Sequence, residues 1–100
     1  MSEVVEFTLN VKPGHYSGVL ALYSDFAHTY MDLNPTLLNV LVVGDEGTGV
    51  VRGIAVYSDH DAAAAVNSDA FFGAFMGAIE SLIEGAPNRM LLDLVHAWSR

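Results

Sequence analysis

Cysteine is absent from this chain of 100 residues, and cations are scarce, with one lysine and three arginines against twelve acids. Without thiols there is no disulfide framework and no thiolate chemistry, and a cytoplasmic location is the default expectation. A net charge of −8 leaves no basic cluster to displace counterions from phosphate, which excludes a nucleic-acid partner. No apolar run approaches the roughly 18 residues of a membrane span, so no membrane association is expected. The opening MSEVVEF lacks a basic segment, so we expect no signal peptide.

Apolar residues are abundant in this chain. Hydrophobic residues make up 52% of the sequence and charged residues only 16%, against about 25% charged in a typical domain. The length fits one domain over residues 1–100, which would bury roughly 60% of its unfolded surface. A chain of this composition has more apolar surface than a small monomer can readily bury. A dense core is one interpretation, and a self-association interface is the one we favour.

The first half predicts a strand and then a helix. Apolar and polar side chains alternate over Val4–Val11, which is typical of a strand with one fully apolar face. From His15 to about Leu33, apolar residues recur every three or four positions and predict one helix. Asn34-Pro35 should end that helix, because a residue before proline is disfavoured in the α region.

A hairpin is expected in the middle of the chain. Thr36–Val43 and Val50–Tyr57 are rich in β-branched residues and almost continuously apolar, and the turn sequence GDEGTG separates them. Continuous apolar character predicts that both faces of these strands are covered.

A second helical region and a last strand complete the pattern. The helix is expected to begin near Ser58, to break at Asn67-Ser68-Asp69, and to continue in a phenylalanine-rich segment that ends at Gly85. Arg89–Trp98 then predicts a strand that is apolar on both faces.

The order strand, helix, strand, strand, helix, strand predicts an α+β, ferredoxin-like βαββαβ fold. Its four-stranded antiparallel sheet would carry both helices on one face. The other face would also be apolar, and two copies packed sheet to sheet would hide it. The sequence therefore predicts a homodimer formed through the sheet face.

Three segments carry a resemblance to a known family. They are Val11–Gly14 at the end of the first strand, Gly53–Tyr57 leading into a helix, and Asn67–Phe72. With them the chain resembles the dimeric α+β barrel superfamily, in its antibiotic biosynthesis monooxygenase-like branch, over nearly its whole length. The resemblance implies a homodimeric barrel with a small-molecule pocket between sheet and helices.

The resemblance also implies two kinds of activity. Some members oxidise phenols or quinols with molecular oxygen and no metal or cofactor, and others degrade haem. The haem-degrading members use an asparagine, a tryptophan and a histidine at positions that hold Phe7, Val66 and Met76 here, so haem degradation is disfavoured. Tyr57 stands where a tryptophan usually ends the third strand.

Histidine is the first candidate for chemistry, since it titrates near neutrality. His15, His28 and His60 border or lie on expected helices and are interpreted as surface residues. His96 is expected inside the last strand, so it would be either a structural histidine with a partner or a pocket residue. No histidine pair has the spacing of metal ligands, and no metal site is expected.

Arg52 is the only cation inside an expected apolar strand, with Glu6 or Asp93 as its natural partner. It would form either a structural ion pair in the dimer interface or a contact to an anionic or phenolate substrate. The sequence thus predicts His96 and Arg52 as catalytic residues. The residues expected to contact a substrate are Asn39, Tyr57, Trp98 and Asn10.

Two functions remain open at this point. One is a monooxygenase without cofactor that acts on a small phenol or quinol in a dry apolar pocket. The other is a barrel without catalysis, which binds a small apolar or aromatic molecule or serves only in assembly.

Overall fold

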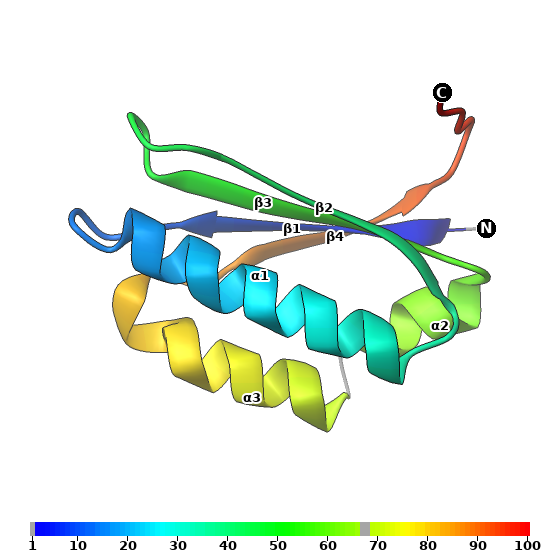
Figure 1. Cartoon of the computed structure of the whole chain (residues 1–100), viewed down its shortest axis with the longest axis horizontal. Coiled ribbons are helices and arrows are strands. Elements are labelled where there is room, and N and C mark those ends of the chain that lie inside the picture. Colours follow the sequence, from blue (N-terminus) through cyan, green and yellow to red (C-terminus); the bar gives the residue numbers. More distant parts are fainter. Residues whose placement is uncertain (1, 67–68) are drawn as a thin grey trace.

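The computed structural model describes residues 2–66 and 69–100. In chain order the elements are β1 (Ser2–Asn10), α1 (Tyr16–Leu33), β2 (Leu37–Asp45), β3 (Val50–Tyr57), α2 (His60–Ala65), α3 (Ala70–Ile79), the 3₁₀ turn η2 (Glu80–Leu82) and β4 (Asn88–Asp93). The strands form one antiparallel sheet in the order β2-β3-β1-β4. Helices α1 and α3 cover one face of this sheet, and the opposite face carries no helix (Figure 1). The ferredoxin-like α+β fold expected from the sequence is confirmed.

The alternation in β1 sets the two faces of the sheet. Val5, Phe7 and Leu9 point toward the helices and belong to the core, whereas Glu6 and Thr8 point to the open face. The same split runs through β3, where Val51 is fully buried and Arg52 is exposed. Burying an apolar side chain stabilises the fold by roughly 1.5–3 kcal/mol, so a register slip of one residue would be costly.

The long helix α1 follows its expected stripe only in part. Val19, Tyr23 and Tyr30 are buried against the sheet. Leu22 and Leu33, which share the stripe in the sequence pattern, are exposed at 37% and 61%. A stripe of residues spaced by three and four is wider than the contact between one helix and the sheet, so its margins reach solvent.

The second crossover consists of two short helices, each with an acidic N-cap. The Asp59 carboxylate accepts a hydrogen bond of 2.8 Å from the backbone N–H of Ala62, which places the first cap one residue after the expected Ser58. The Asp69 carboxylate accepts one of 3.0 Å from Phe72 N–H and begins α3. The expected break is therefore present, although Asn67 and Ser68 lie outside the described residues.

The cap of α2 gives a first test. Replacing Asp59 with alanine should lower the free energy of unfolding by about 1 kcal/mol, because an N–H of the first turn loses its acceptor. Urea unfolding followed by circular dichroism measures the change. Asp61→Ala, in the same turn but after the cap, is the control and should cost less.

The last strand is shorter than expected. β4 ends at Asp93, and residues 94–100 have no regular structure, so His96 and Trp98 do not lie in a strand. The reason lies in the pairing: Asp93 is opposite Ser2, the first residue of β1, and β4 is an edge strand. Residues beyond Asp93 have no neighbouring strand to hold their backbone groups. In the described part of the chain, no helix is both long and apolar enough to cross a membrane.

Candidate functional site

A small cavity lies between the helix-covered face of the sheet and α1. Its volume is about 30 Å³, which is room for one or two water molecules. Its walls come from β1, β2, β3, α1 and the α2–α3 region. The lining residues are Val5, Phe7, Tyr23, Phe26, Ala27, Tyr30, Leu37, Val40, Gly53, Ile54, Ala55, Tyr57, Val66 and Phe72.

Three tyrosines supply the only polar side chains of this described lining. Tyr23 and Tyr30 lie two turns apart on α1, and Tyr57 is the last residue of β3. All three are almost fully buried, with 4–6% of their surface exposed. Tyr23 lies directly over Gly53, since a side-chain carbon at that position would overlap the tyrosine hydroxyl. The missing side chain in β3 is what makes room for the Tyr23 ring.

The hydroxyls of Tyr30 and Tyr57 share a hydrogen bond. Burial raises the pKa of Tyr57, and the hydrogen bond raises it further, whereas the same bond lowers the pKa of Tyr30. The hydroxyls of Tyr30 and Tyr57 therefore interact with each other within the lining of the cavity.

Charge and burial keep these tyrosines neutral. Burial alone raises the pKa of Tyr23, and burial is also the main cause at Tyr30 and Tyr57. The Asp69 carboxylate adds a negative field that raises the pKa of both Tyr30 and Tyr57. Near neutral pH the three hydroxyls are protonated hydrogen-bond donors rather than bases.

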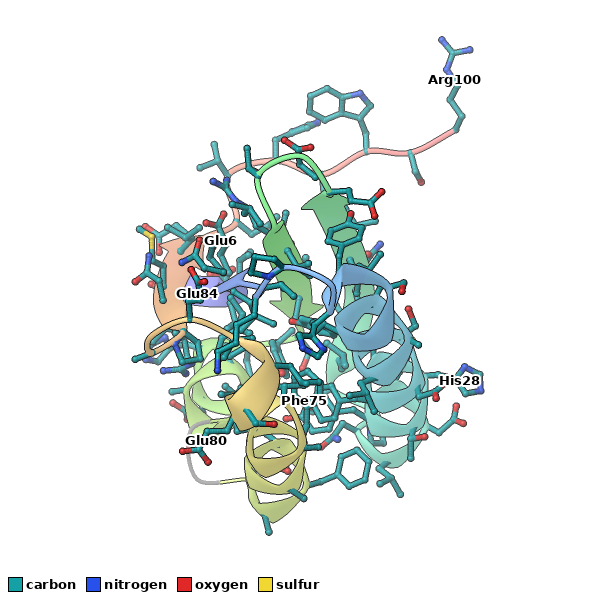
Figure 2. All side chains as sticks on the ribbon, turned by 90° about the vertical axis from the view of Figure 1, so that its left-hand side faces the viewer. Glu6, His28, Phe75, Glu80, Glu84 and Arg100 are labelled. Atoms are coloured by element: carbon teal, nitrogen blue, oxygen red, sulfur yellow. The ribbon has the colours of Figure 1, made fainter. Side chains whose placement is uncertain are left out.

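Phe26 and Phe72 contribute rings to the helical wall of the cavity, and further rings of α1 and α3 pack against Phe26. Phe26 stacks on Phe75 at 4.4 Å between ring centroids, on Tyr30 at 5.0 Å and on Phe71 at 5.4 Å. Figure 2 shows Phe75 between the helical layer and the sheet. Stacked rings of this kind tie α1 to α3 and exclude water from the tyrosine hydroxyls.

Of the six residues predicted from sequence to form the site, only Tyr57 lines the cavity. Asn10, Asn39 and Arg52 lie on the open face of the sheet, with the layer of strands between them and the cavity. Arg52 is opposite Thr8 and Val43, and in the described part of the chain it forms no ion pair with Glu6 or Asp93. A single strand sends neighbouring side chains to opposite faces, so Arg52 and the cavity residue Gly53 are separated.

His96 and Trp98 lie in the irregular C-terminal segment, outside the sheet. Their rings contact each other at 4.1 Å between centroids. The other histidines also lie away from the cavity: His28 projects from α1 into solvent (Figure 2), 3.8 Å from Asp32, and the His60 Nδ1 is 2.9 Å from the Ser2 carbonyl oxygen. Across residues 2–66 and 69–100, no three acidic or histidine side chains gather into a metal site.

Sequence reasoning missed Tyr23, Tyr30 and Asp69 as site residues. The two tyrosines occupy the apolar stripe of α1, where an aromatic ring is usually interpreted as core, and the sequence pattern places Asp69 only in the break between two helical segments. The signal that could have found them is the hydroxyl itself: a tyrosine in a fully apolar stripe needs a hydrogen-bond partner.

No protein-family model matches the sequence, and no curated protein sequence matches it. Solved structures do match. One, from Caulobacter crescentus and provisionally named an antibiotic biosynthesis monooxygenase, has a TM-score of 0.81 at 24% identity over 93% of this chain and 89% of that one. Another, named antibiotic biosynthesis monooxygenase, has a TM-score of 0.76 at 20% identity over 93% and 98%.

A protein of unknown function from Nitrosomonas europaea has a TM-score of 0.81 at 16% identity, over 100% of this chain and 96% of that one. The chain shares the fold of these proteins. The resemblance to antibiotic biosynthesis monooxygenase-like proteins inferred from the sequence agrees with these structural neighbours. At such identities the likeness concerns the fold, and the activity has to be argued from the cavity.

Proposed function

We propose that this chain is a monooxygenase without cofactor that acts on a small phenol or quinol, bound in the tyrosine-lined cavity. The observation that carries the proposal is a small apolar cavity whose polar side-chain groups, in the described lining, are three neutral tyrosine hydroxyls. The names of two structural neighbours support the same class of reaction.

The chemistry matches this lining. A quinol that reacts with oxygen to give a hydroxyquinone and water supplies all four electrons itself: two from its oxidation to the quinone and two from the C–H bond that becomes C–O. One oxygen atom enters the ring, and the other leaves as water with the two hydroxyl protons. The protein needs only to hold the substrate oxygen, favour its anionic form and keep out water.

Named residues can fill these roles. The hydroxyls of Tyr57 and Tyr23, both protonated at neutral pH, donate hydrogen bonds to the substrate oxygen as its negative charge develops. The negative charge of Asp69 raises the pKa of Tyr30 and Tyr57 and so helps to keep both hydroxyls protonated. The ring wall of Phe26 and Phe72 supplies the apolar surface for an aromatic substrate.

The small size of the cavity favours a second candidate, a barrel without catalysis that serves in assembly. A cavity of about 150 Å³ holds benzene, whereas this one measures about 30 Å³. A substrate the size of a phenol must therefore displace side chains of the lining.

Turnover of a naphthohydroquinone under isotopically labelled oxygen separates the two candidates. We expect labelled hydroxyquinone above the uncatalysed rate, and a loss of about 100-fold in kcat/KM for Tyr57→Phe, because one hydrogen-bonding hydroxyl is removed. His28→Ala, on the exposed surface of α1, is the control and should retain full activity. Thermal stabilisation by a naphthol without labelled product would support binding alone, and the absence of both would contradict the site.

We further propose that the protein is a homodimer that pairs its open sheet faces. Leu41, Val43 and Met90 on this face are 45–55% exposed, and Ile54 and Leu92 lie beside them. Arg52 and Glu6 share the same face without forming an ion pair in the described chain. A face that carries both signs is complementary to its own copy across a two-fold axis.

A further inference from the structure

Arg89 in β4 places a guanidinium on the helix-covered face of the sheet. Its register partner in β1 is Phe7, and residues directly opposite each other on neighbouring antiparallel strands point to the same face. Phe7 belongs to the core and lines the cavity. Arg89 therefore lies on the opposite face of the sheet from Arg52, one strand beyond a wall of the cavity.

Two nitrogen atoms of this guanidinium, Nε and Nη2, are buried and have no hydrogen-bond partner. Within residues 2–66 and 69–100, Arg89 also forms no ion pair with a carboxylate. Leaving a buried charge without a partner is strongly destabilising. In a chain with twelve acids and only four lysines and arginines, a buried cation without an acidic partner is unexpected. An anion from outside the chain would compensate this charge.

The two unpartnered atoms define the shape of that anion. Nε and Nη2 lie on the same edge of the planar guanidinium, so their N–H groups point in parallel. Two parallel donors match the two oxygens of a carboxylate, and this bidentate pairing is stronger than a hydrogen bond to a neutral acceptor. A single carbonyl or hydroxyl oxygen would match this edge less well. The Arg89 edge therefore favours a carboxylate.

Arg89 and the tyrosine hydroxyls flank the same residue. Gly53, which lies beneath Tyr23, and Arg89 are the register partners of Phe7 on its two sides. Two strand spacings, about 10 Å, therefore separate the backbones of positions 53 and 89. The Phe72 ring meets the Phe7 ring edge-on, at 5.3 Å between centroids, and also lines the cavity. The rings of these two phenylalanines stand between the cavity and Arg89.

We propose that Arg89 is a specificity residue that binds a carboxylate of the substrate. The substrate is then a phenol or quinol whose fused rings carry a carboxylate at the end opposite to the hydroxyl. Its hydroxyl lies at Tyr23 and Tyr57, and its rings displace the Phe72 ring. Its carboxylate accepts two hydrogen bonds, from Nε and Nη2 of Arg89. The inference rests on the proposed function for the place of the hydroxyl, and it concerns recognition of the substrate rather than its oxidation.

The affinities of three naphthalene probes, measured by titration calorimetry, test the carboxylate site. In 6-hydroxy-2-naphthoate the two groups lie at opposite ends of the rings, in 3-hydroxy-2-naphthoate they are adjacent, and 2-naphthol has no carboxylate. We expect 6-hydroxy-2-naphthoate to bind about 10-fold more tightly than 2-naphthol, as for hydrogen bonds to a charged group. The adjacent isomer should gain much less, because its carboxylate cannot reach Arg89 while its hydroxyl contacts the tyrosines.

Variants of Arg89 assign the preference to this side chain. Arg89→Gln should abolish the preference for 6-hydroxy-2-naphthoate and leave the affinity for 2-naphthol unchanged. Arg89→Lys keeps the charge without the paired donors and should lose most of the preference. Arg100→Gln is the matched control, because it removes the same charge from a side chain that lies clear of the body of the molecule (Figure 2). A preference that survives in Arg89→Gln would overturn the inference.

Thermal unfolding of the ligand-free protein gives a second measurement. Arg89→Met removes a buried charge that has no partner, so it should raise the Tm by about 4–8 °C. A lower Tm would mean that the guanidinium is already paired in the folded chain, which would overturn the inference.

The binding and turnover experiments fail independently. If a naphthohydroquinone is turned over but 6-hydroxy-2-naphthoate binds no more tightly than 2-naphthol, the carboxylate site is wrong and the proposed function stands. If the carboxylate preference depends on Arg89 but no labelled product forms, the Arg89 site stands and the oxygenase is wrong. If none of the three probes binds, the carboxylate site is overturned together with the phenol site.

Discussion

Gly53→Ala is expected to lower the free energy of unfolding by about 1–3 kcal/mol, a large loss for the addition of one methyl group. The new Cβ would overlap the Tyr23 hydroxyl and approach Tyr23 Cε1 to 3.2 Å. Tyr23 is buried and packs on Phe7 and Phe75, so its ring cannot turn away without disturbing the core. Urea unfolding at neutral pH measures the loss.

Gly73→Ala is the matched control, because a Cβ there has no atom within 4 Å. Gly73 lies inside α3, where alanine is the better helix former, so this variant should gain about 0.5–1 kcal/mol. Opposite changes in the free energy of unfolding of the two variants would exclude the possibility that replacing any glycine destabilises the fold. A double-mutant cycle with Tyr23→Leu should show coupling between positions 23 and 53, and additive losses would contradict the proposed overlap.

The Gly53 contact also illustrates what the sequence could not reveal. A glycine inside the apolar run Val50–Tyr57 indicates a close approach of some other group, but the approaching ring comes from α1, thirty residues earlier in the chain. Hydrophobic periodicity identifies which face of α1 is buried. It does not identify which residue of the sheet each ring meets, because that depends on how the helix crosses the strands.

Most of the fold was predictable because every strand has a local signal. Alternation marks β1, the GDEGTG turn marks the hairpin, and Asp69 caps the helix after the break. The end of β4 was not predictable, because 94–98 is as apolar as a strand. In the structure Asp93 pairs with Ser2, the first residue of β1, and the described residues after Asp93 pair with no strand.

The candidate site was predictable only at Tyr57. Polar side chains in otherwise apolar strands predict Arg52, Asn39 and Asn10 as site residues, and these residues face away from the helices. In a sheet with helices on one side, such polar side chains lie on the open face, where water or a second sheet can meet them. The polar groups that line the cavity are tyrosine hydroxyls instead. In the sequence pattern, the tyrosine rings cannot be distinguished from core residues.

The buried tyrosines give the largest expected effect of a change in pH. Burial raises the pKa of Tyr23 and Tyr57, so both stay protonated in the folded protein while the unfolded chain ionises near pH 10. Above that pH the unfolded state releases protons that the folded state keeps, so stability present below about pH 10 is lost as the pH rises. Above that pH, each of the two residues lowers the free energy of unfolding by about 1.4 kcal/mol per pH unit. The two together lower it by about 3 kcal/mol per pH unit. Burial also raises the pKa of Tyr30, although the hydrogen bond with Tyr57 offsets part of that rise.

Free energies of unfolding measured from about pH 8 to pH 11 test this tyrosine effect. Tyr57→Phe should reduce the slope above pH 10 by about 1.4 kcal/mol per pH unit, because one of the protons retained on folding is gone. Phe75→Leu removes a ring of similar burial without a hydroxyl, so it should lower stability at every pH and leave the slope unchanged. If Tyr57→Phe left the slope intact, the Tyr57 hydroxyl would ionise as it does in water. It would then be open to solvent and not part of the water-excluding cavity that the proposed site requires.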